Sequence, residues 1–328
     1  MTHATAAACG RGCGISLVDR VPTGDKGGAS RGAMSLRRIL TIYNPTAGRR
    51  ARGKLERFRA ALARLGASVT LAETQGPLHA RELAASADPA RFDVVAVAGG
   101  DGTINEAVNG MVGSPLPLAL LPLGTANVLA HELGLPHAAE ALAAIAAHSP
   151  ARSIVPAEIV TAERNQPWRF LLMAGIGFDA EVVAHLDTRL KRRIGKGAYL
   201  IGSLARLARH ERRCFSARID GRDEAPASLV VARAHFYGGR FVLAPEARLD
   251  TPQLYAVLFP APSRLAALRY MAGVVTGILA RQCDVEVRRA AEIELSGPEG
   301  APVQIDGDIR AHLPASIRLA TSPLAIIA

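Results

Sequence analysis

The sequence predicts a two-domain protein, with an α/β domain first and a β-rich domain after it. Strands and helices alternate through residues 34–155, and short apolar runs separated by Gly, Pro and Asp turns follow through residues 156–328. A chain of 328 residues suits two cores, since a domain averages roughly 150 residues. Residues 1–33 show no apolar period, and we expect a disordered extension there.

In the first domain, each apolar strand precedes a segment with apolar residues at helical spacing. The expected strands are 36–43, 69–72, 93–98 and 118–121, and the expected helices are 54–65, 79–87 and 138–147. This alternation predicts a parallel sheet covered by helices on its faces. Ligands of such sheets bind beyond the carboxyl ends of the strands.

The second domain has the pattern of antiparallel strands joined by tight turns. The expected strands are 170–173, 216–219, 229–232, 254–259, 285–288 and 292–295. The last strand of the chain is free to return to the first domain.

Composition restricts the partners and the compartment. The net charge of +10 favours an anionic partner, while an aromatic content of 4% without interleaved basic residues argues against nucleic acid. The longest apolar stretch, 271–280, is shorter than the ~20 residues that span a bilayer, and residues 1–33 lack the apolar core of a secretory signal. The four scattered cysteines do not form a disulfide framework. We therefore expect a cytoplasmic protein, with homo-oligomerisation left open.

The most informative segment is a glycine turn, 97–106, between an apolar strand and a helix. Its three glycines allow close backbone approach to phosphate oxygens, and N–H groups at the helix start point at negative charge. Asp101 lies within the turn, where it can hold Mg²⁺. The alternative is a plain turn in which Asp101 only caps the helix that follows.

Three segments together resemble the diacylglycerol kinase-like lipid kinases, which include sphingosine kinases and bacterial lipid kinases. The sequence Asn-Pro-Thr-Ala-Gly at 44–48 resembles the family's first loop, 99–105 its nucleotide loop, and Pro-Leu-Gly-Thr-Ala-Asn at 122–127 its third block. The resemblance implies a Rossmann-like nucleotide-binding domain over 34–155 and a β-sandwich-like domain over 156–328. It also implies ATP and Mg²⁺ as cofactors, and transfer of the γ-phosphate to a hydroxyl of a lipid such as diacylglycerol or a sphingoid base.

The resemblance also assigns candidate site residues. The implied nucleotide contacts are Asn44, Thr74, Gly99, Gly100, Asp101, Gly102, Thr103, Ile104, Asn105 and Thr125, with Asp101 as the metal ligand and a catalytic residue. Residues 304–308 resemble the family's Asp-Gly-Glu motif, so Asp308 would receive the proton of the acceptor hydroxyl. The alternative is a simple hairpin turn at Asp306-Gly307 with Asp308 solvated on a strand.

Three other patterns are weaker. Residues 48–55 nearly match a P-loop, but Leu55 stands where Ser or Thr would hold Mg²⁺. Residues 175–180 fit a dinucleotide fingerprint without its ribose-binding acid, and we expect a tight turn there. Many bacterial members of the family that the chain resembles carry a structural Mg²⁺ site at an Asp-Gly turn. Thr251-Pro252 stands in place of that turn here, so the site is not carried over, although the neighbouring Asp250 could partly substitute.

A basic amphipathic segment, 189–213, is the candidate for contact with the inner face of the membrane, where a lipid alcohol would be reached. The alternative is a helix packed on the β-rich domain with a solvated basic face. Two rival functions remain at this point: an NAD kinase-like phosphotransferase, and a catalytically silent lipid- or nucleotide-binding protein.

Overall fold

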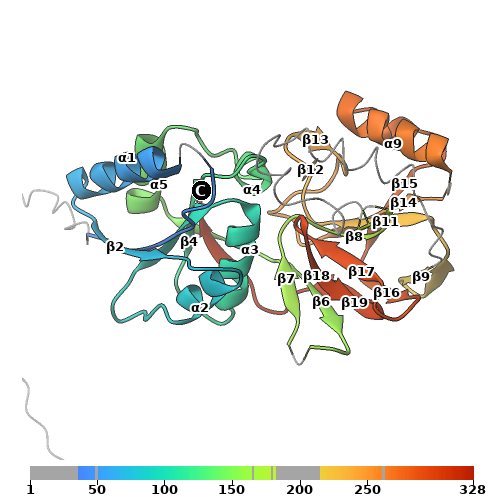
Figure 1. Ribbon diagram of the computed structural model, residues 1–328, viewed down its shortest axis with the longest axis horizontal. Helices are drawn as coiled ribbons and strands as arrows, with labels where there is room; N and C mark the ends of the chain where they lie inside the picture. The colour runs from blue at the N-terminus through green and yellow to red at the C-terminus, as the bar shows by residue number, and fades with distance from the viewer. Residues whose placement is uncertain (1–35, 49–50, 165, 179, 182–214, 261–262) are drawn as a thin grey trace, which may run out of the picture. The chain divides into compact units, whose positions relative to one another are not determined.

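The computed structural model describes residues 36–48, 51–164, 166–178, 180–181, 215–260 and 263–328. The chain from Leu36 to Ala328 forms one compact unit with two lobes, each built on its own sheets (Figure 1). The predicted extension 1–33 and the predicted membrane segment 189–213 lie outside the described residues. In the described part of the chain, no helix is long and apolar enough to span a bilayer.

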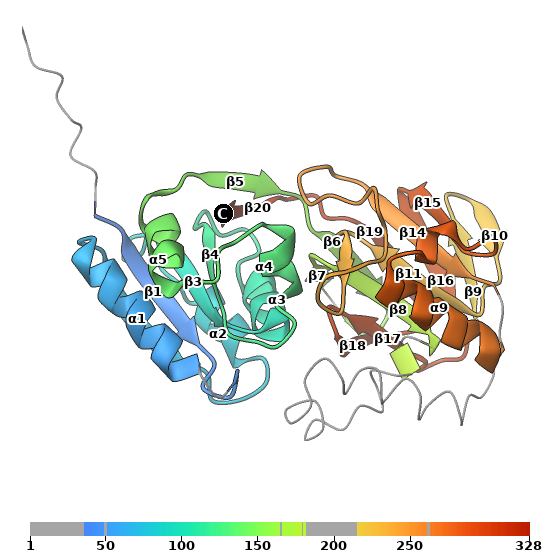
Figure 2. The same cartoon turned by 90° about the horizontal axis from the view of Figure 1, so that it is seen from above.

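The first lobe contains a six-stranded sheet in the order β2-β1-β3-β4-β20-β5. Its strands are β1 (Arg38–Tyr43), β2 (Ser68–Glu73), β3 (Val94–Gly99), β4 (Leu118–Pro122), β5 (Ala151–Ile154) and β20 (Leu324–Ile327). Strands β1 to β4 and β20 run parallel, and β5 pairs antiparallel with β20. The carboxyl-terminal strand of the chain thus lies beside β5 in the sheet of the first lobe (Figure 2).

Helices cover both faces of this sheet. Helix α1 (Ala51–Arg64) packs with α5 (Ala139–His148) on one face, and α2 (His79–Ala85) packs with α3 (Asp101–Gly110) on the other (Figure 1). Because both faces are covered, every residue of β3 is buried. The short helix α4 (Val128–Glu132) follows the loop after β4.

The second lobe is a sandwich of two six-stranded antiparallel sheets, which confirms the predicted fold class. One sheet has the order β10-β9-β16-β19-β6-β7 and the other β15-β14-β11-β8-β17-β18. Ile293 and Leu295 of the first sheet share one buried core with Leu229 and Val303 of the second. The strands of the first sheet are β6 (Ala157–Thr161), β7 (Trp168–Phe170), β9 (Ser216–Ile219), β10 (Arg222–Glu224), β16 (Glu292–Ser296) and β19 (Ala315–Leu319).

The second sheet contains the strands that reach the candidate site. They are β8 (Met173–Gly177), β11 (Ser228–Ala232), β14 (Leu254–Phe259), β15 (Glu286–Ala290), β17 (Pro302–Ile305) and β18 (Asp308–His312). A small hairpin, β12 (Phe236–Tyr237) with β13 (Phe241–Val242), helix α9 (Arg264–Thr276) and the 3₁₀ turn η1 (Leu279–Arg281) complete the lobe.

The strand predicted at 170–173 is wrong, because the chain changes sheets inside it. β7 ends at Phe170 in one sheet and β8 begins at Met173 in the other. Leu171 and Leu172 form the corner, and their backbone N–H groups bond a buried carboxylate rather than a neighbouring strand. Helix α9 was not predicted, although Ser263 as its N-cap and Gly277 with φ 74° after its end are the ordinary boundary signals.

Candidate active site

The strand order of the first lobe reverses between β1 and β3, and the loops after these strands meet there. Asn44 follows β1, and its backbone N–H donates to Ala98 O on β3 at 3.0 Å. Its side-chain Nδ2 donates to Thr103 Oγ1 on α3 at 2.9 Å. Since ligands of open α/β sheets bind where the strand order reverses, this corner is the candidate site.

Glycines allow two loops to touch through their backbones at this corner. A Cβ on Gly100 would lie 3.3 Å from the Cα of Gly124, and a Cβ on Gly124 would lie 2.7 Å from the Cα of Gly100. A Cβ on Gly99 would lie 2.6 Å from the Cβ of Thr103. The loops at 99–102 and 122–127 therefore form a single corner lined by backbone, for which only glycine is small enough.

The start of α3 lies in this corner and can bind an anion. Gly100 is the N-cap of α3, and it has no side chain to satisfy the N–H groups of the first turn. The helix dipole favours a negatively charged ligand at this end of α3.

Asp101 has a structural role that the sequence did not reveal. Its Oδ2 accepts a hydrogen bond from Val128 N at 3.0 Å and its Oδ1 accepts one from Leu129 N at 3.2 Å. Asp101 thus caps the start of α4, whose own N-cap residue Asn127 makes no side-chain cap bond. The alternative considered from the sequence had Asp101 cap α3, whereas in the structure it caps α4.

A carboxylate at this corner suits a cation that arrives with phosphates. No three His, Cys, Asp or Glu side chains gather as a metal cage among the residues that the structure describes. Mg²⁺ is commonly held by one or two carboxylates together with substrate phosphates. Asp101 at the start of α3 supplies such a carboxylate.

Asp306 and Gly307 form the two-residue turn between β17 and β18. Ile305 pairs with Asp308 across the turn, and φ is 49° at Asp306 and 91° at Gly307. Positive φ at both positions is the type I′ geometry that matches the twist of a hairpin. Asp306-Gly307 is thus a hairpin turn, as that alternative had it, but Asp308 is not simply solvated: its side chain is 39% exposed and lies against the first turn of α3.

Asp306 is a buried carboxylate that fastens this hairpin to the rest of the site. Its Oδ1 accepts hydrogen bonds from Leu172 N and Met173 N, both at 3.0 Å. Its Oδ2 accepts from Leu171 N at 3.2 Å and from Asn105 Nδ2 at 2.9 Å. The sheet-to-sheet corner after β7, the hairpin and α3 are thereby joined through one side chain.

We expect Asp306 to make unfolding depend on pH between about 4 and 6. Burial raises the pKa of Asp306 from 3.8 to about 6, although the four N–H donors oppose the rise. Since the folded state binds this proton more tightly than the unfolded state, the contribution of Asp306 to stability is largest below pH 3.8, falls as the pH rises to 6 and is constant above. The fall is at most about 3 kcal/mol.

Urea unfolding at several pH values measures this effect. Subtracting the free energy of unfolding of Asp306→Asn from that of the wild type removes the contributions of all other titrating groups, which both proteins share. That difference should decrease from pH 4 to pH 6, and a difference independent of pH would contradict the shifted pKa.

The side chains of Ile104 and Asn105 are both buried. Ile104 is 1% exposed in the core, and Asn105 is 3% exposed. Asn105 Nδ2 donates to Arg169 O as well as to Asp306, and its Oδ1 accepts from Trp168 Nε1 at 2.8 Å. The Asn105 side chain thus joins α3 to β7 and the hairpin, which leaves the backbone of Ile104 and Asn105 for the predicted nucleotide contact.

The remaining predicted nucleotide contacts lie at the same sheet edge. Thr74 directly follows β2, and its backbone N–H donates to Tyr43 O at 2.8 Å. Thr125 is exposed in the loop between β4 and α4, and Thr103 sits in the first turn of α3. The structure brings Asn44, Gly99 to Thr103 and Thr125 to one corner, with Thr74 one strand further out.

Several residues near Asp308 or the glycine corner were not found from the sequence. Arg310 Nη2 lies 2.8 Å from Glu106 Oε1 and 3.3 Å from Asp308 Oδ2. Lys54 Nζ donates to Pro122 O at 2.9 Å, next to the glycine corner, and burial lowers its pKa. Only the near-P-loop pattern around Lys54 gave a signal in the sequence.

The weaker sequence patterns have structural explanations. α1 begins at Ala51, so the second half of the near-P-loop is helix. Gly175 to Gly177 lie on β8 rather than in a turn, and Gly177 with φ 81° ends that strand. At the segment that departs from the structural Mg²⁺ site, the Arg248 guanidinium donates to Pro245 O at 2.9 Å.

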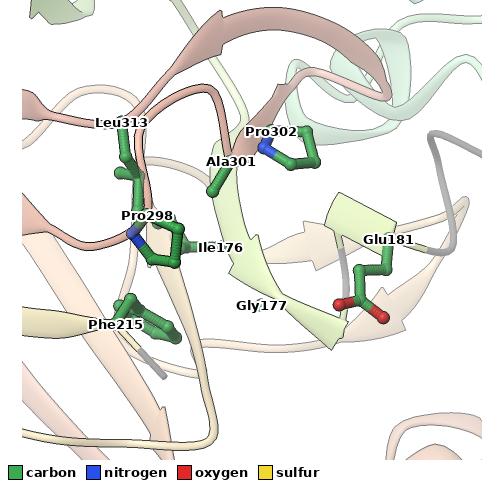
Figure 3. Close-up of a pocket in the computed structure, with 8 residues that line it drawn as sticks. All are labelled: Ile176, Gly177, Glu181, Phe215, Pro298, Ala301, Pro302 and Leu313. Carbon is green, nitrogen blue, oxygen red and sulfur yellow. The ribbon is translucent and has the colours of Figure 1, made fainter. Parts of the chain in front are cut away.

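A small pocket of about 20 Å³ lies in the second lobe, at the end of β8 (Figure 3). Apolar side chains such as Ile176, Phe215 and Leu313 line it together with the buried Glu181. It borders Pro302, which pairs with His312 and is therefore about 13 Å along β18 from Asp308. A volume that holds roughly one water does not accommodate an acyl chain.

This combination of a backbone-lined anion corner on a parallel sheet and a carboxylate from a β-sandwich hairpin defines a two-lobed kinase-like protein. Residues 38–159 match the family model of the diacylglycerol kinase catalytic domain, and residues 173–328 match that of the YegS C-terminal NAD kinase beta sandwich-like domain. The chain belongs to the diacylglycerol kinase family of lipid kinases.

Relatives agree with this assignment, and a solved structure has the same fold. A diacylglycerol kinase of Mycobacterium tuberculosis is 30% identical over 297 residues, covering 88% of this chain and 94% of that protein. A probable YegS-like lipid kinase of Pseudomonas putida is 29% identical, covering 74% of this chain and 85% of that protein. A putative diacylglycerol kinase from Bacillus anthracis has the same fold, with a TM-score of 0.72, 21% identity and coverage of 89% of this chain and 96% of that one.

Proposed function

We propose that this protein transfers the γ-phosphate of ATP to a hydroxyl group of a lipid such as diacylglycerol or a sphingoid base. The observation that carries the proposal is the approach of the Asp308 carboxylate to the first turn of α3, where a Cβ on Gly102 would lie 2.9 Å from Asp308 Oδ2. A proton acceptor and an anion-binding helix start are thus in contact, as transfer of a phosphoryl group to a hydroxyl requires.

In this proposal, ATP phosphates bind the N–H groups at the start of α3. Gly99, Gly100 and Gly102 leave the backbone accessible, and Asn44, Thr103 and Thr125 supply polar groups at the same edge. Asp101 would hold the Mg²⁺ that accompanies ATP. When bound, that ion supplies charge neutralisation on the β- and γ-phosphates.

Asp308 acts as the general base toward the lipid. As the acceptor oxygen bonds to the γ-phosphorus, its proton passes to Asp308 Oδ2, the bond from phosphorus to the bridging oxygen breaks, and ADP leaves. Arg310, which contacts both Asp308 and Glu106, holds the carboxylate in place. Because Asp306 fixes the hairpin through four hydrogen bonds, the base is preorganised before substrate arrives.

We expect Gly102→Ala to lower turnover without lowering stability. The added methyl would displace Asp308 Oδ2, a flexible side-chain end, from its position 2.9 Å away. A misplacement approaching 1 Å costs about 100-fold in rate, whereas Ala in place of a helical Gly favours folding.

Gly53→Ala is the matched control, since Gly53 lies in α1 and an added Cβ there meets nothing within 4 Å. Initial rates and thermal melts of both variants check the prediction. Equal activity of Gly102→Ala and Gly53→Ala would count against the site.

The function itself is tested with labelled ATP. The purified protein is offered ATP and Mg²⁺ with diacylglycerol vesicles, with sphingosine, or with NAD, and the products are separated by thin-layer chromatography. We expect label in a lipid spot. Label in NADP would instead assign an NAD kinase-like activity, and no labelled product in any arm would favour a silent binding protein.

A lipid acceptor requires access to a membrane, and we propose that the protein acts at the inner face of the cytoplasmic membrane. The formal net charge of +10 supports attraction to anionic lipid surfaces. The segment proposed for this contact, 189–213, lies outside the described residues.

A further inference from the structure

Three arginines from separate elements surround the ring of Trp168. The guanidinium carbon of Arg164, in the β6–β7 connection, lies 4.9 Å from the ring centroid, and those of Arg81 on α2 and Arg310 on β18 each lie at 5.5 Å. Trp168 itself is 2% exposed and held by its hydrogen bond to Asn105. We call Arg81, Arg164 and Arg310 the arginine cluster.

The positive charge of the arginine cluster is incompletely neutralised. Arg310 pairs with Glu106 and contacts Asp308. Within the part of the chain that the structure describes, Arg81 and Arg164 make no ion pair, and the nearby Glu163 faces His312 at 3.3 Å. Burial, followed by the charges of Arg310 and Arg81, lowers the pKa of Arg164, so these two neighbours disfavour the charged form of Arg164.

Cation–π attraction to one tryptophan does not explain why three arginines gather around it. Guanidinium groups on the same ring are within roughly 11 Å of one another, where their repulsion is of the same order as a cation–π attraction. Such an arrangement becomes favourable when an anion lies among the cations. Phosphate is the anion that several guanidinium forks match best, because each fork can donate two parallel hydrogen bonds.

The arginine cluster is distinct from the glycine corner. Arg81 lies at the far end of α3, where a Cβ on Gly110 would meet Arg81 O at 2.1 Å. Gly110 is eight residues, or about 12 Å, along α3 from Gly102. The cluster therefore extends from Asp308 away from the nucleotide corner, along the flank of α3.

We propose that the arginine cluster binds a phosphate group next to Asp308, borne by a lipid headgroup or free in solution. The inference rests on the proposed function for its role: a phosphate held beside the general base belongs to the acceptor side of the reaction. It would anchor an anionic phospholipid headgroup while a hydroxyl group reaches Asp308.

Trp168 is the only tryptophan of the chain and reports directly on this site. The full-length protein without ATP is titrated at constant ionic strength with sodium phosphate, with dioleoylphosphatidylglycerol vesicles and with dioleoylphosphatidylcholine vesicles. We expect a saturable change in Trp168 emission with phosphate, with the anionic vesicles or with both. A response to vesicles alone identifies the headgroup as the ligand, and a response to phosphate alone identifies the free anion.

In the double variant Arg81→Gln/Arg164→Gln, the concentration of phosphate or of anionic vesicles at half-saturation should be at least tenfold higher than in the wild type. Arg81→Lys/Arg164→Lys, which keeps the charge, should recover part of the response. Arg91→Gln is the matched control, because Arg91 lies 5.5 Å over the ring of Phe92 outside the cluster, and it should bind like the wild type.

Far-UV circular dichroism and thermal melts verify folding of each variant. A wild type that responds to neither phosphate nor anionic vesicles, or a folded Gln/Gln variant that responds as the wild type does, would overturn the proposal. Because no ATP is present, the outcome is independent of turnover: binding without kinase activity refutes the proposed function alone, and kinase activity without binding refutes this inference alone.

Discussion

Asp308→Asn should lower lipid phosphorylation by about 100- to 10,000-fold while leaving the fold unchanged. The amide keeps the shape of the side chain but cannot accept the proton of the acceptor hydroxyl. The stability cost is small because the Asp308 side chain is 39% exposed and because Arg310 retains its partner Glu106 at 2.8 Å. The KM for ATP should change little, since the phosphate corner is formed by backbone around Gly100 and Gly102.

Asp308→Glu is the matched control for this prediction. It restores a carboxylate with one additional methylene, so it should regain part of the activity that Asp308→Asn loses. Steady-state rates with labelled ATP, together with thermal melts, check both variants. If Asp308→Asn kept more than a tenth of the wild-type rate, Asp308 would not be the general base of the reaction.

The largest expected effect on stability comes from Asp306→Ala. The substitution leaves four buried N–H donors without an acceptor, those of Leu171, Leu172, Met173 and the Asn105 side chain. At about 1 kcal/mol or more for each donor, the free energy of unfolding should fall by about 4 kcal/mol. Activity should also fall, because this hairpin carries Asp308.

The chain contains a matched control for Asp306 in another Asp-Gly hairpin. Asp220-Gly221 joins β9 to β10, with φ of 48° at Asp220 compared with 49° at Asp306. Asp220 is exposed, and its Oδ1 accepts hydrogen bonds from Ala291 N and Glu292 N, both at 2.9 Å. Backbone strain at positive φ therefore cancels between Asp306→Ala and Asp220→Ala.

Asp220→Ala should cost about 1 kcal/mol, because water reaches the exposed donors that it leaves. Urea unfolding of both variants at pH 7 measures the difference. Equal losses of stability would show that the buried network around Asp306 contributes no more than a surface turn.

Helix α3 explains why the hairpin of the second lobe matters to the first. Its first turn faces the anion corner, and its later residues Asn105 and Asn109 bond the backbone of Arg169 on β7. Asn105 also donates to Asp306. The helix that would bind phosphates is thus fixed to the elements that carry the proton acceptor.

Local features of the chain predicted the first lobe well. Apolar runs such as 93–98 and 118–121 fall within one or two residues of β3 (Val94–Gly99) and β4 (Leu118–Pro122), because a strand buried on both faces is apolar throughout. The five-residue helix α4 was missed, since it is too short to show a helical period and depends on capping by the distant Asp101.

The sequence alone determined the alternating architecture, the glycine corner and the Asp-Gly hairpin, because these depend on periodicity and on allowed backbone angles of adjacent residues. Only the tertiary structure decided that Asp308 lies against Gly102, that the Asn105 side chain is hydrogen-bonded inside the protein, and that three arginines share one tryptophan. Those contacts join residues far apart in the chain, and their positions follow from sheet order and packing, which leave no local pattern in a single sequence.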